Sequence, residues 1–185
     1  MPYHAVPLAS ITMPARLPRR IVVDGLHLTD DDSARAVMTD FAHVQPVGVA
    51  RDRHIDDALQ DMIQAGVRSL LVIAEGVVIG LITSYDIQGE KPIQFLQGTD
   101  CIHESCLHRD VLVDDIMVRW EALPKLSLDA LGRQRVGDLR LTFAQHPEWM
   151  HLLVIETQDD GACFVRGIVS RTRLERLTDL QKVAA

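Results

Sequence analysis

Helix-like and strand-like stretches of apolar residues follow one another along the chain in an order that occurs twice. In residues 56–65 the apolar positions return at helical spacing, and Gly66 follows, which predicts a helix that ends there. Residues 70–73 and 77–82 are rich in aliphatic, mostly β-branched side chains on either side of a Glu-Gly pair at 75–76. This arrangement predicts a β-hairpin that follows the helix.

The second half of the chain repeats this order. We pair 113–117 with 34–38, 136–145 with 55–64, 151–155 with 69–73, and 167–170 with 80–83. One repeat has too little apolar surface to form a core alone, whereas two can bury their sheets against each other and leave a cleft between them. The predicted fold class is therefore α/β (α+β), with two tandem β-α-β-β-α repeats packed as one pseudo-two-fold module.

Composition shifts divide the chain into four predicted parts. Residues 1–32 are rich in proline and arginine before an acidic run, and we expect a largely irregular arm that packs as a strap on the domain or on its partner. Residues 33–98 form the first repeat, 99–110 a polar linker and 111–185 the second repeat.

Charge and composition exclude several classes of protein. The formal net charge is −7, which disfavours binding to long nucleic acids, because their affinity comes largely from neutralised phosphates. No apolar run approaches the roughly 20 residues that a membrane helix needs. The beginning of the chain lacks the pattern of a signal peptide, and its three cysteines do not make a disulfide framework. We therefore expect a cytoplasmic protein that binds neither nucleic acid nor membrane.

The segment 80–86, Gly-Leu-Ile-Thr-Ser-Tyr-Asp, resembles the closing motif of the cystathionine-β-synthase (CBS) domain family, in which two domains pair as a Bateman module. Ala58-Leu59 with Met62, the aliphatic stretch 70–73, and 113–117 at the opening of the second repeat fit the same family. The resemblance covers about residues 33–182. It implies a regulatory module that binds adenosine-containing ligands between paired repeats, and two such modules associating as a disc-like dimer.

The same motif suggests how a nucleotide would be held. Thr83 stands where a strand passes into a helix, so its hydroxyl and the free N–H groups there can hold a phosphate, and Gly80 permits a close approach to the backbone. Asp86 can accept hydrogen bonds from ribose hydroxyls, and Arg68 is a candidate phosphate partner. The alternative is that Thr83 and Asp86 only cap the helix. The candidate ligand contacts are Gly80, Ile82, Thr83, Asp86, Arg68 and Ser170.

The second copy of the motif departs from the pattern. Gly167 and Ser170 are kept, but Arg173 stands where the aspartate is expected, and an arginine cannot accept from ribose hydroxyls. We therefore expect one competent site, or none. Arg173 or Arg171 could instead reach a phosphate of a ligand held by the first repeat, or remain a solvated cation.

The sequence contains no set of catalytic residues. It has no phosphate-binding loop, nucleophile elbow or dinucleotide-binding glycine pattern, so we expect a protein that is not an enzyme and needs no cofactor. The linker holds zinc-type ligands in Cys101, His103, Cys106 and His108, but their spacing differs from known zinc sites. We predict a polar linker there and no metal site.

These observations favour a stand-alone regulatory module that binds AMP, ADP, ATP or S-adenosylmethionine, forms a homodimer and signals to a separate effector protein. The alternative is a structural or interaction protein of the same fold that has lost ligand binding, which the altered second motif supports.

Overall fold

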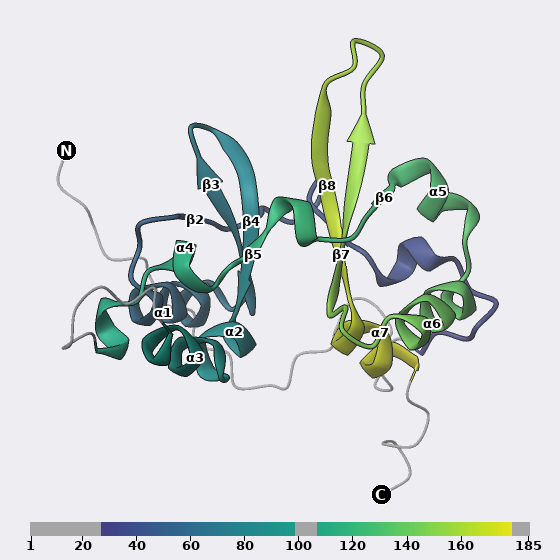
Figure 1. The fold of residues 1–185 in the computed structure, drawn as a ribbon. Helices are drawn as coiled ribbons and strands as arrows, with labels where there is room; N and C mark the ends of the chain where they lie inside the picture. Colours follow the sequence, from purple (N-terminus) through teal and green to yellow (C-terminus); the bar gives the residue numbers. More distant parts are fainter. Residues whose placement is uncertain (1–26, 99–106, 179–185) are drawn as a thin grey trace, which may run out of the picture.

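The computed structural model describes residues 27–98 and 107–178, which form two lobes standing side by side (Figure 1). Each lobe contains a four-stranded sheet, with the strand order β2-β3-β4-β5 in the first lobe and β1-β8-β7-β6 in the second. The long hairpins of the two lobes rise on the same side of the molecule, and most of the helices lie at the opposite side. The α/β fold of two related halves that the sequence predicts is confirmed.

The elements of the two lobes follow the repeat. The first lobe contains β2 (Gly48–Ala50), α1 (Ile55–Ala65), β3 (Ser69–Ala74), β4 (Val77–Thr83), α2 (Ser84–Gln88), α3 (Lys91–Gln97), η2 (His108–Asp110), α4 (Val113–Ile116) and β5 (Val118–Arg119). The second lobe contains η1 (Ala34–Val37), β1 (Thr39–Asp40), β6 (Lys125–Ser127), α5 (Leu128–Arg133), α6 (Val136–Gln145), β7 (His151–Thr157), β8 (Cys163–Ser170) and α7 (Arg171–Thr178), and η3 (Trp120–Ala122) joins β5 to β6.

The first helix and hairpin form as the sequence pattern predicts. Helix α1 buries Ala58 and Met62, and Gly66 ends it in the left-handed conformation with φ of 66°. The turn between β3 and β4 places Glu75 at φ 50° and Gly76 at φ 80°. Ile63 is one of the apolar positions at helical spacing in 56–65, for which we expected one buried face, but it is 63% exposed and does not reach the core.

The short segment that opens each repeat packs on the other lobe. Strand β1 runs antiparallel to β8 and β5 runs antiparallel to β4, so each sheet is completed by a strand from the other half of the sequence. Val37 and Met38 lie in the core of the second lobe, while Ile116 and Met117 lie in that of the first. The division of the sequence into repeats at 33–98 and 111–185 stays a prediction. The lobes do not coincide with these repeats, because the opening segment of each repeat belongs to the other lobe.

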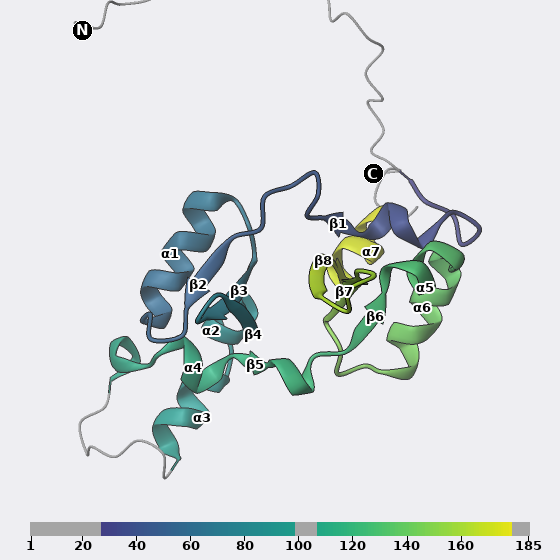
Figure 2. The same ribbon diagram turned by 90° about the horizontal axis from the view of Figure 1, so that it is seen from above.

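The two sheets also share a small apolar core, which fixes the cleft between them. Leu71 and Leu81 of the first lobe cluster with Leu123, Leu153 and Ile168 of the second. Seen from above, the connection from β1 to β2 and the connection from β5 to β6 cross between the lobes on opposite sides of the molecule (Figure 2). Within residues 27–98 and 107–178, none of the helices has the length and apolar character that crossing a membrane requires.

Candidate functional site

Two cavities open between the lobes, one beside each connection. The first, of about 220 Å³, is lined by Thr83, Asp86 and Lys91 from the first lobe, together with residues of the β5–β6 connection, and we call it the Asp86 cavity. The second, of about 260 Å³, is lined by Arg68 and by Ser170, Arg173 and Arg176, together with residues of the β1–β2 connection, and we call it the arginine cavity.

The two cavities share part of their wall. The side chains of Leu81, from β4, and His151, from the first position of β7, line both of them. The pseudo-two-fold repeat explains this arrangement. Each cavity lies between the strand-to-helix junction of one repeat and the opening segment of the other repeat. The candidate site therefore consists of two cavities of different charge, on either side of a wall that includes Leu81 and His151.

Thr83 and Asp86 form a capping box at the start of α2. The backbone N–H of Thr83 donates to Oδ2 of Asp86 over 2.8 Å, the Thr83 hydroxyl donates to the same oxygen over 2.7 Å, and the N–H of Asp86 donates to that hydroxyl over 3.2 Å. Helix α2 has only five residues. The groups that the motif offers to a phosphate are therefore engaged within the helix cap.

The second carboxylate oxygen of Asp86 also has a partner. The ammonium group of Lys91 lies 2.6 Å from Oδ1 of Asp86, and it also donates to the backbone carbonyl of Ile116 over 3.1 Å. The Asp86 side chain is 13% exposed and that of Lys91 is 40% exposed, so the ion pair lies at the mouth of the cavity. A ribose that binds Asp86 must share or displace this lysine.

The arginine cavity carries the opposite charge. Arg173 donates from Nε to the carbonyl of Val37 over 2.9 Å, and its backbone N–H donates to the hydroxyl of Ser170 over 3.1 Å. In the described ranges no carboxylate lines this cavity or forms an ion pair with Arg68, Arg173 or Arg176. Three guanidinium groups that converge on one cavity without a counter-charge favour an anionic ligand.

The predicted contacts therefore fall into three groups. Thr83 and Asp86 line one cavity, and Arg68 and Ser170 line the other. Ile82 is fully buried in the core of the first lobe and does not line the cleft. Gly80 is also buried, and a Cβ built on it would lie 2.7 Å from the carbonyl oxygen of Val118. Gly80 therefore permits the close approach of β5, the strand that the second half of the sequence adds to the sheet of the first lobe.

Sequence reasoning left Arg176 out and did not decide between Arg173 and Arg171. Arg173 and Arg176 are three residues apart on α7 and so lie on one helix face, which was the available signal. Arg171 points away from the cleft, because its guanidinium donates to the carbonyls of Phe143, His146 and Trp149 over 2.7–3.0 Å. Arg171 therefore ties the end of α6 to the start of α7.

His151 lies at the centre of the cleft. Burial lowers the pKa of its imidazole from 6.5 to about 4, although the nearby charge of Asp86 acts in the opposite direction. His151 is therefore neutral at neutral pH in this structure. A neutral imidazole on the wall of both cavities can accept one proton when an anion enters.

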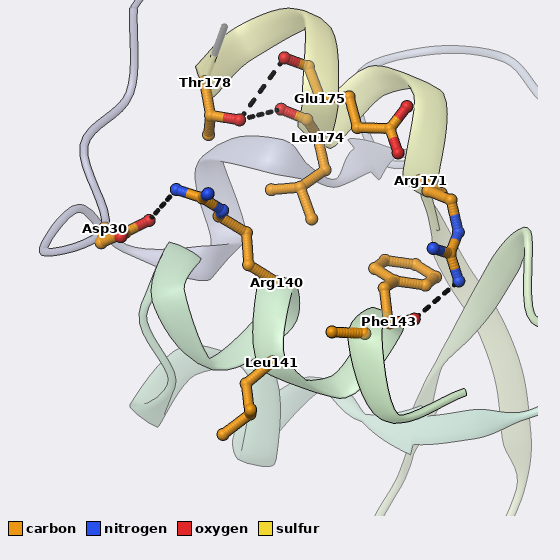
Figure 3. Close-up of a pocket in the computed structure, with 9 residues that line it drawn as sticks. Asp30, Arg140, Leu141, Phe143, Arg171, Leu174, Glu175 and Thr178 are labelled. Carbon is orange, nitrogen blue, oxygen red and sulfur yellow. Dashed lines mark hydrogen bonds and ion pairs between the residues drawn. The ribbon is translucent and has the colours of Figure 1, made fainter. Parts of the chain in front are cut away.

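A larger cavity, of about 660 Å³, lies between α6 and α7, away from the two cavities described above (Figure 3). Arg140 projects toward it and pairs with Asp30 over 2.9 Å, and Arg171 turns to the backbone beside the ring of Phe143. The two arginines of this cavity are thus already engaged, in contrast to those of the cleft.

The zinc-type cluster of the linker falls mostly outside the described residues. Only His108 is described, and its Nδ1 lies 3.2 Å from Oδ1 of Asp56. In ranges 27–98 and 107–178, no three His, Cys, Asp or Glu side chains are grouped so as to hold a metal ion.

Comparison with known proteins relates one part of the sequence to a family and the whole fold to solved structures. Residues 34–90 match the sequence model of the CBS domain family, and no curated protein matches the chain. An uncharacterized conserved protein from Pyrococcus horikoshii aligns with a TM-score of 0.51 at 21% identity, over 80% of this chain and 93% of its own.

Two further solved structures have the same fold. A protein with CBS domains from Burkholderia ambifaria aligns with a TM-score of 0.52 at 19% identity, over 76% of this chain and 89% of its own. A CBS-domain containing protein from Agrobacterium tumefaciens aligns with a TM-score of 0.51 at 15% identity, over 85% of this chain and 98% of its own. The family resemblance seen in the sequence is confirmed for residues 34–90, and the fold is confirmed for most of the chain.

Proposed function

We propose, from the premise that residues 34–90 are a CBS domain within a chain that has the fold of CBS-domain proteins, that this protein is a regulatory module for an adenosine-containing nucleotide. The ligand binds in the cleft between the lobes. The observation that carries this proposal is the charge of the two cavities between the lobes, with Asp86 lining one and Arg68, Arg173 and Arg176 lining the other.

The two ends suit the two halves of a nucleotide. Guanidinium groups are strong, directional donors to phosphate oxygens, whereas a carboxylate accepts from the hydroxyls of a ribose. The arginine cavity therefore suits the phosphates of a nucleotide, and the Asp86 cavity suits a ribose. Of the ligands that the sequence suggests, AMP, ADP and ATP fit this charge pattern. S-adenosylmethionine fits it poorly, because its sulfonium group is a cation.

Isothermal titration calorimetry with AMP, ADP, ATP and S-adenosylmethionine tests the proposal. We expect wild-type protein to bind at least one of the phosphorylated ligands, and Arg68→Gln to weaken that binding about tenfold, since a charge-assisted hydrogen bond contributes roughly 1.5–3 kcal/mol. Arg133→Gln is the matched control, because Arg133 is an exposed arginine of α5 outside both cavities. Equal losses in the two variants would contradict the assignment of the arginine cavity.

A second candidate function is a CBS-fold interaction protein that binds no ligand. The observation that favours it is the engagement of both carboxylate oxygens of Asp86, by Thr83 and by Lys91. A thermal-shift screen separates the two functions, because a ligand that binds only the folded protein raises its melting temperature. No shift with any adenine nucleotide at millimolar concentration would favour the interaction protein.

Regulation requires that the ligand distinguish two arrangements of the protein. We include in the proposal that nucleotide binding changes how the two lobes meet at Leu81 and His151. A homodimer, a separate effector protein and a cytoplasmic location belong to the same proposal. Small-angle scattering with and without the bound nucleotide tests the change in arrangement, and an unchanged profile at saturation would contradict it.

A further inference from the structure

We infer that His151 is a ligand-contacting residue shared by the two cavities, and that it takes up a proton when a phosphorylated ligand occupies the cleft. This inference rests on the proposed function, which it deepens by naming the residue that links binding to pH. It begins from the position of His151, which lines both the Asp86 cavity and the arginine cavity.

The strand register holds His151 in this position. It opens β7 and pairs with Ser170, the last residue of β8, so its side chain is set beside the start of α7. The next residue along β7, Leu152, is buried in the core of the second lobe. In the described part of the chain, no group forms a hydrogen bond with the imidazole of His151. Its ring nitrogens are therefore available to a ligand.

Charged groups face His151 from the elements on both sides. They are Asp86 of α2, Lys91 of α3 and Glu148 of the segment before β7 in one cavity, and Arg68 before β3, with Arg173 and Arg176 of α7, in the other. The cations outnumber the anions in this group. In the protein alone, burial disfavours a positive charge on His151, and the charge of Asp86 offsets this only in part.

A phosphate group reverses this balance. It brings negative charge into the arginine cavity, offsets the guanidinium charges and can accept a hydrogen bond directly from a protonated imidazole. The pKa of His151, which lies at about 4 in the structure, should therefore rise when the ligand binds. By linkage, if ligand binding raises the pKa of His151 by one unit, the protein with a protonated His151 binds the ligand about tenfold more tightly than the protein with a neutral His151.

The direct test follows the imidazole carbon resonances of His151 by NMR as a function of pH, assigned by their loss in His151→Gln. We expect the titration midpoint to rise by about one pH unit or more when the protein is saturated with ADP. The resonances of the exposed His54, which precedes α1 and lines neither cavity, serve as the internal control and should not respond to ADP. An unchanged His151 midpoint at verified saturation with ADP overturns the inference.

A second measurement separates this inference from the proposed function. Calorimetry at pH 5.5 in buffers of different ionisation enthalpy reports the number of protons taken up when ADP binds. Subtracting the number measured for His151→Gln from that for wild type removes the protons that the ligand itself takes up. If ADP does not bind, the same NMR titration is done with pyrophosphate. A shifted midpoint then supports the role of His151 while the nucleotide function fails, and no shift with either ligand overturns the role of His151.

Discussion

Lys91 and Asp86 close one end of the cleft, where the lysine ammonium lies 2.6 Å from Oδ1 of the aspartate. The other oxygen of Asp86 accepts two hydrogen bonds from Thr83. The residue that the sequence motif offers to a ribose therefore carries a competing partner in the protein alone. We therefore expect Lys91 to compete with a ribose for Asp86.

Replacing Lys91 should strengthen nucleotide binding. Lys91→Gln removes the cation from Oδ1 of Asp86, and because a partly exposed ion pair contributes less than about 1 kcal/mol, we expect an affinity gain of about two- to fivefold. Calorimetric titration with ADP measures it. In an Asp86→Asn background the same lysine substitution should have no effect, and a gain of equal size there would show that Lys91 acts elsewhere.

The two helix caps should contribute unequally to stability. Thr83 and Asp86 cap each other reciprocally, whereas Ser170 only accepts from the N–H of Arg173. We expect Thr83→Val to lower the free energy of unfolding by about 1–2 kcal/mol and Ser170→Ala to lower it by about 1 kcal/mol or less. Urea denaturation followed by circular dichroism measures both.

Thr142→Val is the control for this comparison. The hydroxyl of Thr142 donates to the carbonyl of Asp138 one turn earlier in α6, which the helix does not need, so the expected change is below about 0.5 kcal/mol. A loss in Thr83→Val no larger than about 0.5 kcal/mol, the limit expected for the control, would show that the capping box does not stabilise the fold.

The repeat was predictable because both halves of the chain contain helix-like and strand-like apolar stretches in the same order. Such a short series of elements can pack in only a few ways. The hairpins around 75–76 and 158–162 and the helix 55–65 follow from local chemistry, since turns and helix ends depend on neighbouring residues. Helix α5 was not predicted, because the six residues 128–133 show no apolar pattern long enough to indicate a helix.

The exchange of segments between the lobes and the charge of the cavities could not be predicted from local sequence patterns. Nothing in residues 34–40 indicates that they pair with β8, which is more than 120 positions away, because the pairing depends on how the lobes assemble. The same assembly brings Arg68 beside Arg173 and Arg176. The sequence identified Arg68 and Ser170 separately, and the structure shows that they line one cavity.

The exchanged strands predict the effect of adding a methyl group at the motif glycines. A Cβ at Gly167 would lie 2.5 Å from the carbonyl oxygen of Thr39 in β1, and the equivalent contact at Gly80 is 2.7 Å, to Val118 of β5. Backbone atoms cannot move aside as a side chain can, so Gly167→Ala and Gly80→Ala should each destabilise the protein by about 1–3 kcal/mol. Thermal unfolding followed by circular dichroism measures these effects.

Gly132 of α5 provides the matched control for these glycines. A Cβ at Gly132 would meet nothing within 4 Å. Gly132→Ala should stabilise the protein by up to about 1 kcal/mol, because alanine has the higher helix propensity. If Gly167→Ala behaved like Gly132→Ala, β1 would not lie against β8 in solution.

The low pKa of His151 predicts that the protein loses stability on mild acidification. Unfolded histidine titrates near 6.5, whereas His151 in the folded protein titrates at about 4. Above pH 6.5 both states are neutral, and the linkage is zero. Between pH 6.5 and about 4 the unfolded state binds the proton that the folded state excludes, so stability falls by about 1.4 kcal/mol per pH unit.

We therefore expect wild-type protein to be less stable at pH 5 than at pH 7.5 by roughly 2 kcal/mol from this group, as measured by urea denaturation. His151→Gln should remove most of that difference, while His43→Gln, at an exposed position, should leave it unchanged. Asp32 does not interfere, because its hydrogen bonds with Thr29 lower the pKa of its carboxyl below 3.8, and its contribution is lost only at more acidic pH. A pH dependence identical in wild type and His151→Gln would show that the imidazole is solvated and does not form the wall between the cavities.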